Sequence, residues 1–315
     1  MFLPPVIALH IPDGFLSVPV AAFGWLLLVA ALAAALRQTR AQLGERQVPM
    51  MGVIAAFVFA AQMINFPVAG GTSGHLVGGA LVAILLGPWA AVLVMTSVIA
   101  VQALLFQDGG LLALGFNAVN MGVLSALVGY TVFRQLSRLA GEDRGYLLRA
   151  GIAAWVSVEV AAAATALQLA VSGTSPLTLA LPAMLGIHAA IGLGEALITA
   201  GALAFIRQTR PDLLQSHTAA ARGSGWVAAG LVIALAVALV SPLASSDPDG
   251  LERVAIDQGF EELAQEPGYE LLPDYTIPFV EHEALTTILA GVLGVLAVAA
   301  VTYGLARFVR RGQSV

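Results

Sequence analysis

The sequence predicts an all-α polytopic integral membrane protein with about nine transmembrane helices, a core of seven followed by a hairpin of two. Of its 315 residues, 59% are hydrophobic and only 10% are charged, whereas an ordinary soluble domain carries roughly 25% charged residues. The charges lie between long apolar stretches, and about 20 apolar residues suffice to span a bilayer as a helix. These observations exclude a soluble enzyme and a nucleic-acid-binding protein, and the net charge of −5 agrees.

Two residue types are absent. There is no cysteine, which excludes disulfides, iron–sulfur ligation and thiolate metal sites. All 14 basic residues are Arg, which excludes a phosphate-binding P-loop and Schiff-base chemistry, because both need a lysine. If the protein moves a substrate uphill, ATP must therefore bind to another chain.

Arginine clusters fix the expected topology, because Lys and Arg accumulate in cytoplasmic loops. Four clusters follow apolar stretches, near residues 37–46, 134–149, 207–222 and 307–311. Nine apolar stretches are the candidate helices, at about 16–36, 50–66, 76–86, 88–106, 111–133, 147–172, 178–206, 226–244 and 285–306. With all four clusters inside, the chain crosses the bacterial inner membrane nine times, with an extracytoplasmic amino terminus and a cytoplasmic carboxyl terminus.

The elements follow from this count in order. The first stretch runs inward to the first Arg cluster and the second returns outward. The third, residues 76–86, gives only about 16 Å of helix, so we expect it to extend upstream and to end at a tight turn at Gly87-Pro88. The fourth to seventh complete a bundle over residues 1–222. The last two form a hairpin over residues 223–315, joined to the bundle by a Gly/Ser linker at 222–225.

The hairpin encloses an acidic segment, residues 245–284, which carries 11 of the 19 acidic residues and one Arg. The topology places this segment outside the cell. Its charge could concentrate cations through a favourable surface potential, or it could be a solvated loop that happens to be acidic.

Two histidines lie on the same outer side. His10 is followed by Pro12-Asp13-Gly14, a turn sequence in which Pro fixes φ, Asp bonds the local backbone and Gly accepts positive φ. Such a turn could fold His10 back toward the helices. His75 ends the glycine-rich loop 70–75. Neutral imidazoles on an entry face suit Ni, Co, Cu or Zn.

Chelate geometry suggests a fuller ligand set. If the mature chain began at Leu9, through a leucine-type start codon or removal of residues 1–8, then the free amine of residue 9, the amide nitrogen of His10 and His10 Nδ1 would form fused five- and six-membered rings. His75 could add a fourth nitrogen. Square-planar nitrogen coordination suits Ni(II) or Cu(II) rather than Zn(II).

Polar residues in apolar helices form a second tier. Gln62 and Asn65 are three apart, as are Asn117 and Asn120, so each pair is expected to share a helix face. They could orient the histidines or join helices by hydrogen bonds. Glu159, His188 and Glu195 could move protons, or His188 and Glu195 could simply pair within the bundle.

These residues resemble a known family, the CbiM/NikM substrate-capture subunits of energy-coupling-factor (ECF) cobalt and nickel transporters. The resemblance rests on three motifs and covers residues 9–210, and Pro248–Glu252 resembles the PDGLE element of the accessory subunit. The three motifs are His10-Ile-Pro-Asp-Gly-Phe15, Gln62-Met-x-Asn-Phe-Pro-Val-x-Gly-Gly-Thr-Ser-Gly-His75-Leu76 and Asn117-Ala-Val-Asn-Met-Gly122.

The resemblance implies a seven-helix bundle that holds Ni²⁺ or Co²⁺, as in metal supply for cobalamin biosynthesis. Its ligands would be a terminal amine, the next residue (His10) and the loop histidine (His75), with Thr72 and Ser73 among the surrounding loop residues. Family members begin with Met where Leu9 stands here. Transport would require a CbiQ/NikQ-like coupling subunit and CbiO/NikO-like ATPases, and no prosthetic group.

Two alternatives remain open from sequence. Gly71-Thr72-Ser73-Gly74 matches the G-x-S-G loop of rhomboid-type intramembrane serine proteases, for which His188 could be the base. An ATP-independent secondary cation transporter could instead use Glu159, His188 and Glu195 for proton coupling.

Overall fold

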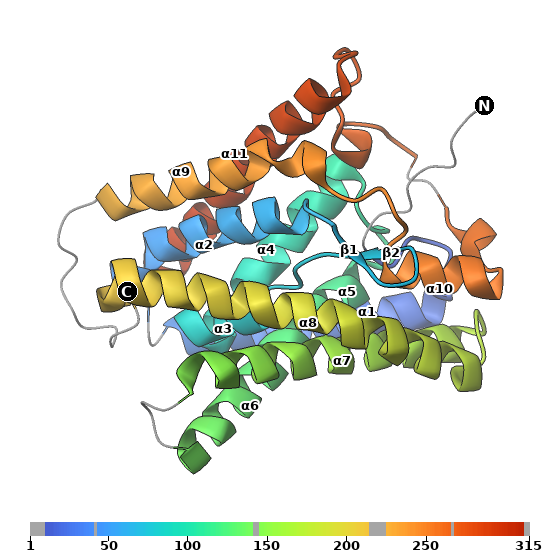
Figure 1. Ribbon diagram of the computed structural model, residues 1–315, viewed down its shortest axis with the longest axis horizontal. Coiled ribbons are helices and arrows are strands. Elements are labelled where there is room, and N and C mark those ends of the chain that lie inside the picture. Colours follow the sequence, from blue (N-terminus) through green and yellow to red (C-terminus); the bar gives the residue numbers. More distant parts are fainter. Residues whose placement is uncertain (1–9, 41–42, 141–144, 214–224, 266–267, 312–315) are drawn as a thin grey trace.

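The chain folds as a bundle of long helices with a two-stranded hairpin and a short helix at one end (Figure 1). The computed structural model describes residues 10–40, 43–140, 145–213, 225–265 and 268–311. The all-α class predicted from sequence is confirmed. The linker residues 222–224 and Leu9 lie outside the described residues.

The elements follow in chain order. The helices of the first part are α1 (Val18–Arg40), α2 (Gln47–Gln62), α3 (Gly79–Leu86), α4 (Pro88–Phe106), α5 (Leu114–Asn117), the π-helical η1 (Ala118–Leu124), α6 (Ser125–Ala140), α7 (Tyr146–Ser172) and α8 (Leu177–Thr209). The strands β1 (Phe66–Val68) and β2 (Thr72–Gly74) pair antiparallel between α2 and α3. The second part holds α9 (Gly225–Leu239), α10 (Gly250–Gln258) and α11 (Glu283–Arg311). One short 3₁₀ turn follows α8 and another follows α9, and two more lie between α10 and α11.

Seven helices of the described chain are long and apolar enough to cross a membrane, so the predicted count of nine is not confirmed. They are α1, α4, the continuous helix α5–η1–α6, α7, α8, α9 with the turn after it, and α11. Helix α2 has 16 residues, about 24 Å of helix. The eight residues of α3 give about 12 Å.

The expectation that the third helix extends upstream is wrong. Residues 66–74 form the β-hairpin instead, and α3 begins only at Gly79. The residue before it, Gly78, has a φ of +84°, which belongs to the left-handed region and interrupts a right-handed helix. The expected turn between the third and fourth helices is present, because Gly87 has a φ of +85° and α4 starts at Pro88.

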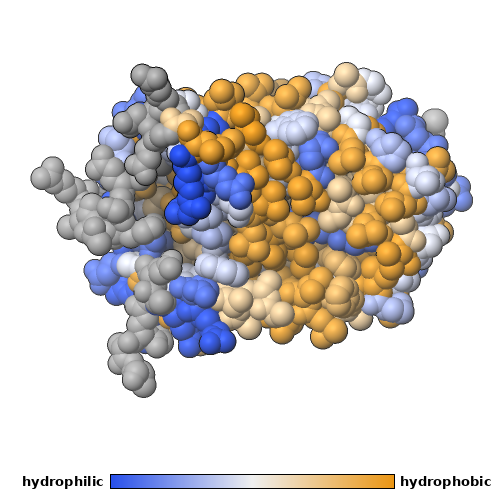
Figure 2. Space-filling model, turned by 90° about the horizontal axis from the view of Figure 1, so that it is seen from below, coloured by the Kyte–Doolittle hydropathy of each residue, from blue (hydrophilic) through white to orange (hydrophobic). Residues whose placement is uncertain are grey.

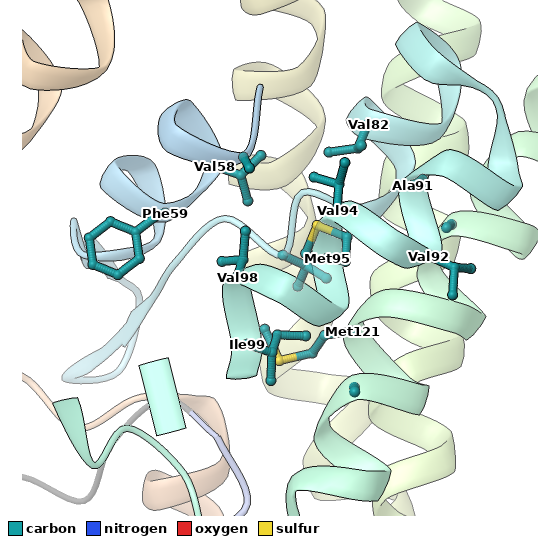
Figure 3. Close-up of a cluster of buried hydrophobic side chains, with 14 of the residues drawn as sticks. Val58, Phe59, Val82, Ala91, Val92, Val94, Met95, Val98, Ile99 and Met121 are labelled. Carbon is teal, nitrogen blue, oxygen red and sulfur yellow. The ribbon is translucent and has the colours of Figure 1, made fainter. Parts of the chain in front are cut away.

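Helix α4 lies at the centre of the bundle, and 72% of its most apolar stretch is buried. Figure 3 shows its side chains Val94, Met95, Val98 and Ile99 among residues of α2, α3 and η1. Lipid tails are as apolar as these side chains, so close van der Waals packing is the main force that holds such helices together.

The last two long helices pack on this bundle. Helices α9 and α11 contact each other and α2, and α11 also contacts α4. At Gly294 the approach is so close that a Cβ would lie 2.0 Å from the ring of Phe59. Figure 2 shows one face of the molecule, where an apolar band lies between more polar ends.

The Arg-bearing helix ends gather at one end of the bundle. Arg46, before α2, forms an ion pair of 2.6 Å with Asp212, just after α8. Arg310, in the last turn of α11, pairs with Glu45 at 2.8 Å. The β-hairpin and α10 lie at the opposite end (Figure 1).

Candidate metal-binding site

The turn after His10 forms as the sequence predicts, with the Phe15 N–H donating to the Pro12 carbonyl. The expectation that Asp13 bonds the local backbone is wrong, because its carboxylate ties the amino-terminal segment to a distant part of the bundle. The Asp13 carboxylate accepts hydrogen bonds of 2.9–3.0 Å from the backbone N–H groups of the three consecutive residues 111–113, just before α5. Gly14 has a φ of +94°, which completes the turn. An anion that binds consecutive free N–H groups near the start of a helix is well placed electrostatically.

His10 is buried among the helices, with 2% of its surface exposed. Its Nδ1 lies 2.5 Å from Oδ1 of Asp108, and its Nε2 is buried without a hydrogen-bond partner. The next residue, Ile11, is held by the Asn117 side chain, which accepts from its N–H at 2.9 Å and donates to its C=O at 3.0 Å. A Cβ on Gly109 would lie 2.6 Å from the His10 Cβ, so only glycine fits beside this histidine.

Asp108 joins His10 to the carboxyl-terminal part of the chain. Its Oδ2 accepts a hydrogen bond of 2.5 Å from the hydroxyl of Tyr275, whose ring stacks on Phe106 at 4.7 Å between centroids. Burial raises the pKa of Asp108, but the charge of His10 and the hydrogen bonds from His10 and Tyr275 outweigh it and hold the pKa below its usual value. Burial and the neighbouring Asp108 raise the pKa of Tyr275 well above its usual value.

Sequence reasoning missed both Asp108 and Tyr275. The sequence did hold a signal for Asp108. Among the acidic residues of the first 222, Asp13 and Asp108 are the two that fall in loops on the expected extracytoplasmic side, where both histidines also lie. No comparable signal marked Tyr275, which lies 167 residues away in the chain.

The second histidine reaches the same place from the β-hairpin. In the hairpin Phe66 pairs with Gly74 and Val68 with Thr72, and His75 follows β2 directly. His75 Nδ1 lies 2.9 Å from the carbonyl of Leu76. The rings of His10 and His75 lie 6.1 Å apart between centroids, so the structure brings together the two histidines singled out from sequence.

A cavity of about 70 Å³ lies between them. His10, His75 and His188 line it together with the amides Asn117 and Asn120. Within the described residues, no three His, Asp or Glu side chains are arranged to hold a metal ion by themselves. Coordination through His10 Nδ1, as in the predicted chelate, requires that nitrogen to exchange Asp108 for the metal.

The residues predicted to surround the two histidines lie in different places in the structure. Asn120 lines the cavity and exchanges two 2.8 Å hydrogen bonds with Gln168. Gln62 Nε2 donates to the carbonyl of Val77, two residues after His75, at 2.9 Å. The expectation that Asn65 shares a helix face with Gln62 is wrong, because α2 ends at Gln62 and Asn65 lies in the link to β1. Thr72 is buried in β2.

The expected pairing of His188 with Glu195 is also wrong. His188 Nδ1 lies 2.7 Å from the carbonyl of Met184, one turn back in α8. Glu195 accepts hydrogen bonds from the backbone N–H groups of Val77 and Gly78 at 2.6 and 2.9 Å. In neighbouring α7, Glu159 has one buried oxygen with no hydrogen-bond partner.

The geometry does not favour a serine protease. Ser73 Oγ donates to the carbonyl of Asp247 at 2.7 Å, and Nδ1 of His188 is engaged with Met184. A nucleophilic serine needs a hydrogen bond to its base, and the described residues show none between Ser73 and His188.

The acidic segment, residues 245–284, covers the cavity. Ser73 N–H donates to the carbonyl of Pro248 at 2.8 Å, and Gln265 N–H donates to that of Asp13 at 2.8 Å. Leu251 lines the cavity, and Gly250 packs so closely on His188 that a Cβ would lie 2.8 Å from its ring.

The start of α10 is fixed by a capping box, in which Asp249 accepts from the Glu252 N–H at 2.7 Å and Glu252 accepts from the Asp249 N–H at 3.3 Å. Burial raises the pKa of Asp249 to about 7. The segment thus forms ordered structure over the site, which its acidic composition did not predict.

The structure therefore defines a multi-pass membrane protein with two buried histidines facing one cavity. A family model described as the cobalt uptake substrate-specific transmembrane region (CbiM) matches residues 10–213, and the model of the PDGLE domain matches residues 224–311. The chain belongs to the CbiM family and carries a PDGLE domain in the same polypeptide.

The chain is similar to individual transport proteins and to a solved structure. The putative fused nickel transport protein NikMN of Archaeoglobus fulgidus is 37% identical over 313 residues, which cover 96% of this chain and 99% of the relative. The fused nickel transport protein NikMN of Rhodobacter capsulatus is 30% identical, with 93% of this chain and 95% of the relative covered. A crystal structure of a truncated transition metal transporter is 35% identical, with a TM-score of 0.57, and covers 63% of this chain and 98% of that one.

Proposed function

We propose that this chain is the substrate-specific membrane component of an ECF-type ABC transporter, which captures Ni²⁺ or Co²⁺ at its extracytoplasmic face for ATP-driven import. It is a metal-transport protein and not an enzyme. The observation that carries the proposal is the meeting of His10 and His75 across one cavity, 6.1 Å apart between ring centroids. Two imidazoles without thiolate or clustered carboxylate suit Ni²⁺ and Co²⁺ rather than Mg²⁺ or Ca²⁺.

The proposed ligands are the terminal amine of residue 9, the amide and ring nitrogens of His10, and His75. Asp13 and Asn117 hold the His10 segment in place. When the metal takes Nδ1 of His10, Asp108 retains the hydrogen bond from Tyr275 on its other oxygen. The buried carboxylate then keeps a donor, which limits the free-energy cost of breaking its bond to His10.

The cavity end of the bundle is proposed to face the outside of the bacterial cytoplasmic membrane. The Arg-bearing ends gather at the opposite end, as the pairs of Arg46 with Asp212 and Arg310 with Glu45 show. Cytoplasmic enrichment of Arg supports this orientation. It leaves the amino terminus outside and the carboxyl terminus inside.

The chain is proposed to consist of a metal-capture bundle (1–222) and a PDGLE module (223–315) whose segment 245–284 closes the cavity from outside. The family matches to 10–213 and 224–311 support this division. The absence of lysine, and hence of a P-loop, supports the need for separate ATPase subunits and a transmembrane coupling subunit.

Uptake of radioactive nickel and cobalt by cells that express the chain with its coupling and ATPase subunits tests the proposal. We expect uptake to require an intact ATPase and to be lost in His10→Ala and His75→Ala. Uptake that persists without the partners but stops when the proton gradient is dissipated would support a secondary transporter instead. Intact-mass measurement of the purified protein tests the amine ligand, which requires a chain that begins at residue 9.

A further inference from the structure

Helix α8 holds the loop that carries His75 on both sides of the histidine. Before it, Gly74 lies against Ile191, and a Cβ at Gly74 would be 2.7 Å from two Ile191 carbons. After it, the fully buried Glu195 accepts hydrogen bonds from Val77 and Gly78. Ile191 and Glu195 are one helical turn apart, so a single face of α8 sets both positions.

The contact at Val77 and Gly78 is well suited to a carboxylate. Two successive backbone N–H groups donate to its two oxygens, Val77 to Oε2 at 2.6 Å and Gly78 to Oε1 at 2.9 Å. The two N–H groups therefore converge on one side chain, as successive backbone N–H groups do in an anion-binding nest.

The carbonyl group of Val77 is also held by a hydrogen bond. Gln62 of α2 donates from Nε2 to the carbonyl of Val77 at 2.9 Å. Both backbone groups of Val77 are therefore held by buried side chains from two different helices. Only Leu76, which is fully buried, separates this anchored residue from His75.

We propose that Glu195 is a positioning residue for metal capture, which acts through Val77 and Gly78 to hold the His75 imidazole at the cavity. The inference rests on the proposed function, in which His75 is a metal ligand. It gives Glu195 a role other than proton transfer, because both of its oxygens are used by the backbone of the histidine loop. Loss of partners around metal ligands typically weakens metal binding about 10- to 100-fold.

The test is Ni²⁺ titration of the full-length chain in detergent, with wild type, Glu195→Ala, Glu195→Gln and His75→Ala. We expect Glu195→Ala to weaken binding about 10- to 100-fold, and Glu195→Gln to lie between it and wild type because one acceptor oxygen remains. Glu159→Ala is the matched control, since it removes a membrane-embedded glutamate of the adjacent α7. It should bind Ni²⁺ as wild type does.

The decisive comparison is the double variant His75→Ala/Glu195→Ala. If Glu195 acts through His75, the double variant binds Ni²⁺ as tightly as His75→Ala alone. The visible absorption spectrum of Ni²⁺ bound to Glu195→Ala should then match that of Ni²⁺ bound to His75→Ala. Additive losses, or a wild-type spectrum in Glu195→Ala, would overturn the inference. If Glu195→Ala does not fold, the same spectrum and cycle are measured with Glu195→Gln.

The same titrations distinguish a wrong ligand set from a wrong role for Glu195. If His75→Ala binds Ni²⁺ as wild type does, the proposed ligand set is wrong. If His75→Ala binds Ni²⁺ more weakly than wild type while Glu195→Ala keeps wild-type affinity, the ligand set stands and the role of Glu195 is refuted.

Discussion

Replacement of Tyr275 by Phe removes one hydroxyl that joins the PDGLE domain to the part of the chain that matches the CbiM family. That hydroxyl donates to Asp108 at 2.5 Å, and Asp108 is 1% exposed. A hydrogen bond to a charged group contributes about 1.5–3 kcal/mol. Because 1.4 kcal/mol corresponds to a factor of ten in an equilibrium constant, the segment around Tyr275, residues 269–280, should open about 10- to 150-fold more often in Tyr275→Phe.

Hydrogen exchange measures this opening directly. The Leu272 amide donates across the two parts of the chain to the carbonyl of Leu105 at 3.1 Å, so its exchange reports detachment of the segment. Exchange in peptides that cover residues 269–280 should accelerate in Tyr275→Phe by the factor given above, while exchange in α7 should not change. Amides that exchange by local opening report its free energy.

Tyr269→Phe is the matched control. Its hydroxyl donates to the carbonyls of Ala103 and Leu104, at 3.3 and 3.1 Å, and has no charged partner among the described residues. Neutral hydrogen bonds contribute about 0.5–1.5 kcal/mol, so exchange should accelerate about 2- to 12-fold. Unchanged exchange in Tyr275→Phe, or a larger effect of Tyr269→Phe, would refute the view that Asp108 anchors the segment.

Three further predictions follow from the structure. Asp13→Ala leaves the N–H groups of residues 111–113 without their acceptor and should lower the thermal unfolding temperature and the Ni²⁺ affinity together; loss of only one of the two would argue against a shared cause. Burial raises the pKa of Asp249 from 3.8 to about 7, so the folded chain binds this proton more tightly than the unfolded chain. Protection of α10 from exchange should therefore fall as pH rises from about 4 to 7 and then level off, and Asp249→Asn should abolish this slope. Gly115→Ala places a Cβ 2.4 Å from the backbone nitrogen of Trp25 and should destabilise the protein by about 1–3 kcal/mol in unfolding measurements, whereas Gly186→Ala, with open space around it, should not.

The parts of the fold that depend on composition and chain direction could be predicted from sequence. Apolar length identified the seven helices that are long enough to cross a membrane, together with two stretches whose helices are shorter. The turn chemistry of Pro12-Asp13-Gly14 placed His10 against the bundle, where it is buried. The glycine-rich loop brought His75 to the same side. Each of these predictions needed only local sequence and the direction of successive helices.

The remaining features depend on contacts that leave no local pattern. Glu195 bonds to backbone N–H groups, which every residue except proline possesses, so no side chain in the sequence identifies its partners. The bond between Tyr275 and Asp108 joins residues 167 apart. The third helix was expected to extend upstream because its apolar run alone is too short to span a membrane, and nothing in the sequence indicated that Gly78 would adopt a positive φ.

Ni²⁺ and Co²⁺ titration of the purified full-length chain, with wild type compared with His10→Ala and His75→Ala, is the direct test of metal capture between the two histidines. We expect one tight site in the wild type and loss of tight binding in each variant, because His10 and His75 each supply a ligand that the other cannot replace. Wild-type affinity in either variant would place the metal away from the cavity between the two histidines.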